Sequence, residues 1–253
     1  MQAPIVIKIG GHELEDELFL TDLAGIIREM STPVVIVHGG GKEISRLQGQ
    51  MGIEPRYIDG VRVTDDRSLA LVEMVLCGTV NKRLVRYLVA GGVEAFGLSG
   101  VDLGLVRAQK MVHPTVDMGF TGEVAAVRGE VLLDMLQRGL TPVIAPICAG
   151  PDSAYNVNAD HVAGAVAAAI GAQKIVFLTN VEGVLIDNHP VMSLTPERTN
   201  TLIADGTIFG GMIPKVRMAL HALDGGISQA VITNLTGLKT HGGTVFEYEA
   251  RLA

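Results

Sequence analysis

The chain has 253 residues, 48% of them hydrophobic and 19% charged, with a net charge of −7. This composition is typical of a folded globular protein with an ample core. No basic run carries interleaved aromatic residues, which argues against nucleic-acid binding. The two cysteines, Cys77 and Cys148, are too few for a disulfide framework and lack metal-ligand spacing. We therefore expect reduced, buried thiols and no protein-held metal ion.

Glycine-rich loops follow the first two apolar runs, residues 4–9 and 33–37. The loops are Gly-Gly-His at 10–12 and His-Gly-Gly-Gly at 38–41, and Lys8 places a charge inside the first run. Glycine lets the backbone approach a ligand closely, and backbone N–H groups at a helix start form an anion site. No Walker A or G-x-G-x-x-G sequence is present. The loops predict two anionic groups held close together; the alternative is two tight turns. His38 is given no catalytic role.

Further apolar runs alternate with segments of helical periodicity along the rest of the chain. These runs are residues 93–98, 141–145, 174–179 and 229–233. The alternation predicts an α/β fold with a largely parallel sheet between helices. A long helix is predicted from about Asp66 to Ala90. Residues 57–63 and 105–127 are interpreted as β-hairpins that project as lids over the sheet edge.

The most apolar stretch, Val162 to Leu178, is not interpreted as a membrane span. Gly171, Gln173 and Lys174 interrupt it, so it is predicted to be an alanine-rich helix followed by a buried strand. The chain enters its first strand almost at once, which leaves no room for a leader peptide. We expect a cytoplasmic protein with no membrane partner.

Lys215 lies where a helix normally disfavours a cation. Pro214 suits the first position of a helix, which would put Lys215 in the first turn, against the helix dipole. The neighbouring Gly210 and Gly211 suggest that an anion shares this place. The alternative is a solvated surface lysine.

Two further polar side chains are candidates for binding. Asp160 lies at the start of an alanine-rich helix that Asn158 can cap. Helix capping is the alternative interpretation of these polar residues, but it does not require Asn156, Asn158 and Asp160 together. Arg62 follows Gly60 in the first hairpin, and its planar guanidinium matches a carboxylate. The alternative for Arg62 is an exposed arginine on an edge strand.

Taken in order, these motifs resemble those of the amino acid kinase family. The motifs are Lys8-Ile-Gly-Gly11, His38-Gly-Gly-Gly41, Gly60-Val-Arg-Val-Thr-Asp65, Gly97-Leu-Ser-Gly-Val-Asp102, Asn156-Val-Asn-Ala-Asp160 and Gly210-Gly-Met-Ile-Pro-Lys215. The resemblance covers nearly the whole chain and is greatest to the N-acetylglutamate kinase branch. It implies a three-layer αβα sandwich formed by a single domain, residues 1–253. About 1–150 would bind the acyl substrate and about 151–253 would bind ATP.

The implied reaction is ATP-dependent phosphorylation of the γ-carboxylate of N-acetyl-L-glutamate in arginine biosynthesis. The resemblance implies that Lys8 and Lys215 neutralise the transferring phosphoryl group and that Asp160 holds both ammonium groups. Gly11, Gly40 and Gly41 would offer backbone N–H donors, and Arg62 and Asn156 would bind the α-carboxylate end. Nucleotide contacts are implied for Lys8, Gly10, Gly11, Asn180, Gly183, Gly210 and Lys215. Mg²⁺ would be held by the ATP phosphates.

One position departs from the branch pattern and keeps an alternative open. N-acetylglutamate kinases usually have Asp where this chain has Asn180, and Asn there is similar to kinases that phosphorylate aminoadipate or glutamate attached to a carrier protein. Residues 73–83 also resemble that branch, whereas the short Gly60–Asp65 motif and the lack of a basic cluster favour the free acetylated substrate. A second alternative is a non-catalytic ligand sensor on the same fold.

The resemblance also implies an oligomeric state. Arginine-inhibited members carry an extra N-terminal helix that builds a hexamer, and this chain begins directly at its first strand. We therefore expect a homodimer without arginine feedback.

Overall fold

A computed structural model describes residues 2–11, 13–187 and 189–249. The strands are β1 (Ile5–Ile9), β2 (Val34–His38), β3 (Arg56–Ile58), β4 (Val61–Val63), β5 (Ala95–Gly100), β6 (Val106–Lys110), β7 (Thr121–Val127), β8 (Thr141–Ala149), β9 (Ala154–Val157), β10 (Lys174–Leu178), β11 (Leu185–Ile186), β12 (His189–Pro190), β13 (Ser193–Leu194), β14 (Ala230–Thr233) and β15 (Thr244–Phe246). The helices are α1 (Glu17–Glu29), α2 (Gly41–Gln50), α3 (Asp66–Glu73), α4 (Asn81–Ala90), α5 (Gly129–Gln137), α6 (Ala159–Ala169), α7 (Pro196–Ala204), α8 (Met212–Asp224) and α9 (Leu235–Thr240), with the shorter or irregular turns η1 (Glu13–Glu15), η2 (Met74–Val80) and η3 (Asp102–Gly104).

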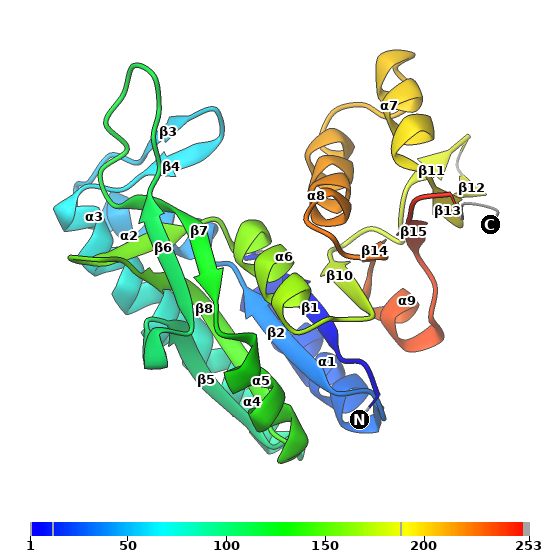
Figure 1. Cartoon of the computed structure of the whole chain (residues 1–253), viewed down its shortest axis with the longest axis horizontal. Coiled ribbons are helices and arrows are strands. Elements are labelled where there is room, and N and C mark those ends of the chain that lie inside the picture. Colours follow the sequence, from blue (N-terminus) through cyan, green and yellow to red (C-terminus); the bar gives the residue numbers. More distant parts are fainter. Residues whose placement is uncertain (1, 12, 188, 250–253) are drawn as a thin grey trace.

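One sheet of eleven strands runs through the molecule (Figure 1). Its order is β13-β15-β14-β10-β1-β2-β8-β6-β7-β9, with β5 paired to β8. All six apolar runs of the sequence are strands of this sheet, and the central strands β14, β10, β1, β2, β8 and β5 are mutually parallel. The predicted mainly parallel sheet is therefore confirmed. Antiparallel pairs occur toward its ends, as between β14 and β15.

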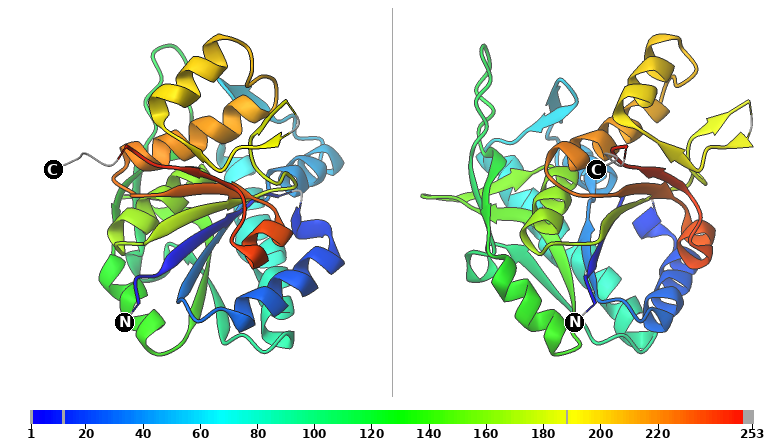
Figure 2. Two further views of the ribbon diagram at one scale, coloured as in Figure 1. Left: turned by 90° about the vertical axis from the view of Figure 1, so that its right-hand side faces the viewer. Right: turned by 45° about the vertical axis from the view of Figure 1, so that its right-hand side comes forward.

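Helices cover both faces of the sheet, which gives the predicted three-layer sandwich (Figure 2). One hydrophobic cluster lies between the sheet and α5, α6 and α8, and the other lies between the sheet and α1, α2, α3 and α4. Strand β1 contributes side chains to both clusters: Ile5, Ile7 and Ile9 belong to the second cluster, whereas Val6 belongs to the first. Since side chains alternate along a strand, Lys8 faces the same side as Val6, toward α6.

The two predicted hairpins take different places in the fold. β3 and β4 form a separate two-stranded sheet, whereas β6 and β7 pair with each other and also join the main sheet. Only the loop between β6 and β7 projects, on the same side as β3 and β4 (Figure 1). A bridge between Thr64 and Gly119 ties that loop to the end of β4. The second hairpin is thus largely a part of the sheet, and its loop extends beyond the sheet edge.

The predicted helix over residues 66–90 is continuous but changes its winding. α3 and α4 are α-helical, and the intervening segment η2 is a π-helix. Hydrogen bonds from each N–H to the fifth preceding carbonyl rotate the later side chains relative to an uninterrupted α-helix. The apolar periodicity at 3.6 residues could not reveal this local change.

The helix that carries Lys215 begins earlier than predicted. α8 starts at Met212 with Gly211 as its N-cap, so Pro214 is the third helical residue and Lys215 the fourth. The prediction that Pro214 occupies the first position is therefore wrong. Proline remains compatible with this place because the first N–H groups of a helix lack intrahelical acceptors.

The helix α3 begins at a carboxylate cap whose effect on stability depends on pH. Asp65 accepts a 2.8 Å hydrogen bond from the backbone N–H of Ser68, and this contact lowers the pKa of Asp65 from its ordinary value of 3.8. The cap is fully formed above that ordinary value and is lost as the pH falls through the lowered folded-state pKa. We expect Asp65→Ala to lower the free energy of unfolding by about 1 kcal/mol at pH 7. Urea denaturation checks this: the deficit should shrink as the pH falls below 4, and a deficit that grows in acid contradicts it.

Both cysteines are free thiols on packed elements. Cys148 is buried in β8 and Cys77 is partly buried in η2. Burial raises the pKa of Cys77 to about 11 and of Cys148 to about 12. The predicted burial is thus confirmed for Cys148, whereas Cys77 is only partly buried. A raised pKa disfavours the reactive thiolate in both. In the described ranges, no helix combines the length and apolar character needed to cross a membrane.

Candidate functional site

Two cavities meet at Lys8, at the carboxyl end of β1. The first has a volume of about 690 Å³ and the second about 260 Å³, and Lys8 lines both. They lie where β1, β2, β10 and β14 all end, because these strands are parallel and adjacent. Ligands of open α/β sheets bind outside the carboxyl ends of the strands. We call the larger one the nucleotide cavity and the smaller one the acid cavity, after the ligands proposed for them below.

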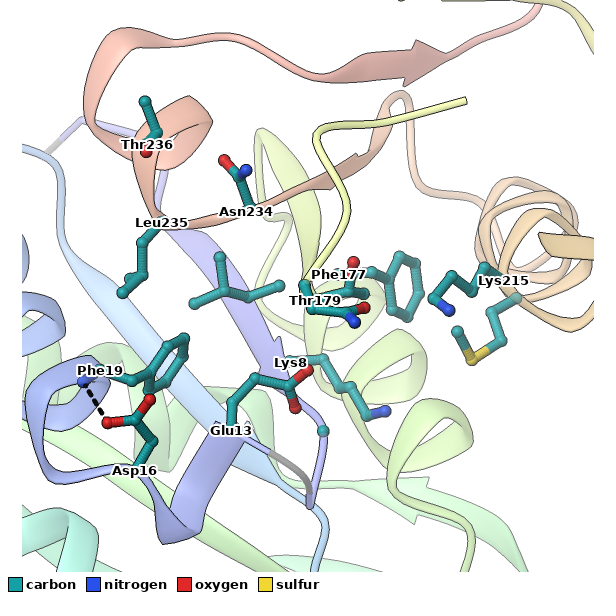
Figure 3. Close-up of a pocket in the computed structure, with 14 residues that line it drawn as sticks. Lys8, Glu13, Asp16, Phe19, Phe177, Thr179, Lys215, Asn234, Leu235 and Thr236 are labelled. Carbon is teal, nitrogen blue, oxygen red and sulfur yellow. Dashed lines mark hydrogen bonds between the residues drawn. The ribbon is translucent and has the colours of Figure 1, made fainter. Parts of the chain in front are cut away.

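The nucleotide cavity is bounded by β1, β10, α1, α8 and the start of α9 (Figure 3). Its lining residues are Lys8, Gly10, Glu13, Asp16, Phe19, Phe177, Leu178, Thr179, Asn180, Lys215, Met218, Asn234, Leu235 and Thr236. Apolar walls alternate with amide and hydroxyl groups, and two ammonium groups enter from β1 and α8. A ligand with a flat apolar part and an anionic part fits this combination.

Lys8 forms an ion pair with Asp160, whose carboxylate Oδ1 lies 2.8 Å from Nζ. The two side chains are 14% and 17% exposed, so their charges are only weakly screened by water. Asp160 stands in the first turn of α6, where the helix dipole favours a carboxylate. Asn158 caps that helix, as predicted, by accepting a 2.8 Å hydrogen bond from the N–H of Asp160. The pair fixes the Lys8 ammonium between the two cavities.

Lys215 enters the nucleotide cavity from α8 but does not reach Asp160. Lys215 and Met218 line the same wall, as expected for residues three apart on a helix. Among the described residues, Lys215 has no ion pair, and the ion pair of Asp160 involves Lys8. Asp160 Oδ1 is buried and accepts no aligned hydrogen bond in the described part of the chain. The structure therefore shows one of the two lysine contacts implied for Asp160 and an oxygen with remaining capacity to accept.

The acid cavity is formed by the two glycine loops, the first hairpin and the start of α6. It is lined by Lys8, Gly11, Gly39, Gly40, Gly41, Ile44, Tyr57, Gly60, Val61, Arg62, Leu76, Thr121, Pro146, Asn156, Val157, Asn158, Ala159 and Asp160. Its volume of about 260 Å³ is below the range of roughly 300–1,000 Å³ that drug-sized ligands use. A small ligand suits it.

Arg62 is buried at the wall of the acid cavity, with 8% of its surface exposed. It donates hydrogen bonds to neutral groups: Gln48 Oε1, the Tyr57 hydroxyl, Ser45 Oγ at 2.8 Å and the Gly41 carbonyl at 3.1 Å. The Tyr57 ring also lies under the guanidinium, and its centroid is 4.8 Å from Arg62 Cζ. Burial lowers the pKa of Arg62, but the group remains charged.

No carboxylate of the described chain forms an ion pair with Arg62. A buried charge without a counter-charge is costly, and the cavity that Arg62 lines can admit an anion. The alternative interpretation of Arg62 as an exposed arginine on an edge strand is wrong.

Asn156 lies on β9 and lines the acid cavity. Its amide Nδ2 donates a 3.0 Å hydrogen bond to Thr64 Oγ1. Thr64 is fully buried and Thr121 Oγ1 in turn donates to the Arg62 carbonyl. Asn156, Arg62 and the loops at Gly11 and Gly40 are thus brought to one cavity from positions far apart in the sequence.

The two glycine loops touch each other across the acid cavity. A Cβ built on Gly11 would lie 3.2 Å from both the Cα and the N of Gly40. We expect Gly11→Ala to force the loops apart and to lower turnover at least tenfold, by the sensitivity of reacting geometry to small displacements. Steady-state kinetics test this, with Gly49→Ala as the control because its Cβ would meet nothing within 4 Å. Full activity of Gly11→Ala would contradict the close approach.

Three residues predicted to bind nucleotide do not line the nucleotide cavity. Gly11 lines the acid cavity, Gly183 is buried against Thr244, and Gly210 is exposed before α8 at φ +56°. Their roles stay predictions. Asn180 and Gly10 do line the cavity. Sequence reasoning missed Glu13, Asp16, Phe19, Asn234 and Thr236, which are ordinary cap or helix residues by their local pattern.

The described residues include no group of three or more His, Cys, Asp or Glu side chains able to hold a metal ion. That Mg²⁺ would be carried by nucleotide phosphates, with water completing its shell, stays a prediction.

The model of the amino acid kinase family matches residues 3–234. The chain belongs to the amino acid kinase family. Its mainly parallel sheet between helices is the fold that the resemblance implied.

Similar proteins are known for nearly the whole kinase chain. It is 54% identical over 241 residues to an acetylglutamate kinase of Roseiflexus sp. (strain RS-1), covering 95% of this chain and 92% of that protein. It is 50% identical to an acetylglutamate kinase of Chloroflexus aurantiacus over 245 residues, 96% of each chain. The solved N-acetylglutamate synthase of Neisseria gonorrhoeae, in complex with coenzyme A and N-acetyl-glutamate, matches with a TM-score of 0.85 and 25% identity. That match covers 98% of this chain and 60% of the synthase.

Proposed function

We propose that this kinase transfers the γ-phosphoryl group of ATP to the γ-carboxylate of N-acetyl-L-glutamate, giving N-acetyl-L-glutamyl 5-phosphate. The observation that carries the proposal is the pair of cavities that share Lys8. One cavity suits a nucleotide and the other a small acid, and an ammonium group stands at their junction. Relatives named acetylglutamate kinase, up to 54% identical, supply the identity of the acid.

Phosphoryl transfer between the cavities needs positioning and charge stabilisation more than covalent help from the protein. Lys8 at the junction and Lys215 from α8 would neutralise charge on the transferring group, while Asp160 keeps Lys8 in place. Backbone N–H groups of the two glycine loops would donate to phosphoryl and carboxylate oxygens. A carboxylate nucleophile is already ionised at neutral pH, so no general base is needed.

The acid would be recognised by its α-carboxylate. Arg62 offers a buried guanidinium without an acidic partner in the described chain, and Asn156 lines the same cavity. Charge-assisted hydrogen bonds to a carboxylate compensate a buried guanidinium. The acetylated amine carries no charge, which suits an acid cavity whose carboxylate, Asp160, is already paired.

Mg²⁺ would be held by the ATP phosphates and would neutralise part of their charge. No chelating carboxylate set of the described residues competes for it. We place the enzyme in the cytoplasm and in arginine biosynthesis, the setting in which an acyl phosphate of N-acetylglutamate is used.

A hydroxylamine assay tests the reaction. The kinase, ATP and Mg²⁺ are incubated with N-acetyl-L-glutamate, L-glutamate, L-aspartate or N-acetyl-L-aspartate, and the hydroxamate is measured. Turnover selective for N-acetyl-L-glutamate supports the proposal. Turnover only with a glutamate or aminoadipate residue attached to a carrier protein would replace the free acid with the carrier-linked substrate. Binding of ATP and acid without any turnover would favour a sensor.

We further propose that the kinase is a homodimer. Exposed apolar side chains gather beside the edge strand β5: Met74 on η2 and Val101 and Leu103 around η3 are 58%, 44% and 66% exposed. Burying such a patch against a second copy would stabilise association. Sedimentation equilibrium should give twice the chain mass, and Leu103→Glu should shift it toward the monomer. A monomeric wild-type protein at micromolar concentration contradicts the proposal.

A further inference from the structure

His38 ends β2 and immediately precedes the glycine loop of the acid cavity. The imidazole is fully buried, and both of its nitrogens have partners. Nδ1 lies 2.9 Å from the carbonyl oxygen of Gly39, and Nε2 lies 3.1 Å from the amide nitrogen Nδ2 of Asn81. None of the roles assigned above uses this group.

The partners determine where the imidazole proton lies. A carbonyl oxygen only accepts, so Nδ1 must carry the proton and donate it to Gly39, and Nε2 is then free to accept from Asn81. The amide of Asn81 is itself oriented, since its Nδ2 donates 2.9 Å to the carbonyl of Val143 and its Oδ1 accepts 3.2 Å from Lys82 Nζ. Burial lowers the pKa of His38 to about 4, which agrees with a neutral ring.

This contact fixes the direction of one peptide group in the glycine loop. The described chain contains no cis peptide bond, and in a trans peptide the C=O and the following N–H point to opposite sides. With the Gly39 carbonyl held on His38, the N–H of Gly40 points away from His38. Gly39, Gly40 and Gly41 all line the acid cavity, and the N–H groups of Gly40 and Gly41 find no acceptor in the described part of the chain.

We propose that His38, held in one tautomer by Asn81, is the positioning residue that aims the Gly40 N–H at the anion in the acid cavity. Glycine has more backbone freedom than any other residue, so a loop of three glycines needs an external constraint to keep a donor aligned. A donor already aligned before the reaction requires no reorganisation in the transition state. The inference deepens the proposed function and rests on it for the identity of the anion.

Nitrogen NMR of the wild-type kinase tests the tautomer without any turnover. Long-range proton–nitrogen correlations of ¹⁵N-histidine-labelled protein should show His38 protonated at Nδ1 and bare at Nε2 from pH 6 to pH 9. An Nε2-protonated or doubly protonated ring would overturn the proposal. Because this readout needs no substrate, it stays informative if the proposed reaction is absent.

A matched pair of variants separates the two ring nitrogens. The side-chain amide nitrogen of His38→Asn can take the place of Nδ1 and donate to Gly39, whereas the amide of His38→Gln reaches the place of Nε2 and loses that donor. We expect His38→Asn to keep kcat within about tenfold of wild type and His38→Gln to lose on the order of a hundredfold, the scale of a lost oxyanion donor. KM for ATP should stay near its wild-type value in both.

The corresponding changes at the exposed His189, on β12, serve as controls. Equal losses in folded His38→Asn and His38→Gln proteins, or a greater loss in His38→Asn, would overturn the positioning role.

A third variant, Asn81→Asp, gives a readout that a purely structural role would not change. The carboxylate only accepts, so it draws a proton to Nε2 and raises the pKa of the ring. At low pH the doubly protonated ring still donates to Gly39, and as the pH rises the proton at Nδ1 is lost. We expect kcat of this variant to fall with rising pH while the wild type stays flat in the same range. A kcat that does not change with pH in folded Asn81→Asp contradicts the proposal. If neither His38 variant folds, the pH profile of Asn81→Asp alone tests the positioning role.

Discussion

Replacing Lys8 with alanine should lower kcat by on the order of a hundredfold or more, the effect of removing a charge-stabilising donor from a preorganised site. Lys8 is the residue that lines both cavities, and its ammonium lies 2.8 Å from Asp160 Oδ1. The ammonium would therefore stand beside the group that moves from one ligand to the other. Steady-state kinetics with saturating ATP and N-acetyl-L-glutamate measure the effect, and Lys215→Ala should show a loss of similar size.

Two companion variants make the Lys8 result specific. Lys239→Ala removes an exposed lysine of α9 and should leave kcat unchanged. Asp160→Asn keeps the shape of the side chain at the start of α6 but removes the counter-charge of Lys8. It should therefore lower kcat, and its effect on the stability of the fold should be smaller than its effect on kcat. If Lys8→Ala binds both ligands and turns over at the wild-type rate, the junction is not where transfer occurs. If it loses binding alone, the sensor alternative is favoured.

Replacing Arg62 with alanine should raise KM for N-acetyl-L-glutamate by at least about thirtyfold while KM for ATP changes little. Truncating one partner of a buried charge pair costs about 2–5 kcal/mol, and Arg62 is 8% exposed beside the acid cavity. The nucleotide cavity does not include Arg62, which is why the two KM values should separate.

The contributions of the charge and of the shape of the guanidinium to acid binding can be tested separately. Arg62→Lys keeps the charge but cannot form a bidentate contact, so its KM should lie between those of wild type and Arg62→Ala. Arg62 also holds Gln48, Ser45 and the Tyr57 hydroxyl, and thermal unfolding must show that the variants stay folded. Arg198→Ala on α7 is an exposed control. Equal increases in both KM values would indicate a general loss of structure and not of acid recognition.

Much of the sheet and part of the site could be predicted because their signals are local. The apolar runs that form β1, β2 and β10 are buried almost throughout, and Lys8 is conspicuous because it interrupts one of these runs. Parallel strands bring their carboxyl ends to one edge, which places the glycine loops after β1 and β2 side by side. The start of α6, with Asp160 in its first turn, follows from the Asn158 cap.

The remainder depends on contacts between distant residues that no local pattern encodes. Gln48 and Ser45 on α2 orient Arg62, yet in the sequence they are ordinary polar residues of an amphipathic helix. Asn81 looks like a helix residue and is in fact buried against His38, 43 positions away. The π-helical turn η2 and the early start of α8 are changes of one or two residues, which hydrophobic periodicity does not resolve.

A crystal structure with a non-hydrolysable ATP analogue, Mg²⁺ and N-acetyl-L-glutamate tests the central claim most directly. We expect the nucleotide in the cavity of about 690 Å³ and the acid in the cavity of about 260 Å³. The α-carboxylate should lie on Arg62, and the γ-carboxylate should face the γ-phosphate beside Lys8. Finding the acid outside the smaller cavity, or the two reacting groups separated by protein, would contradict the account.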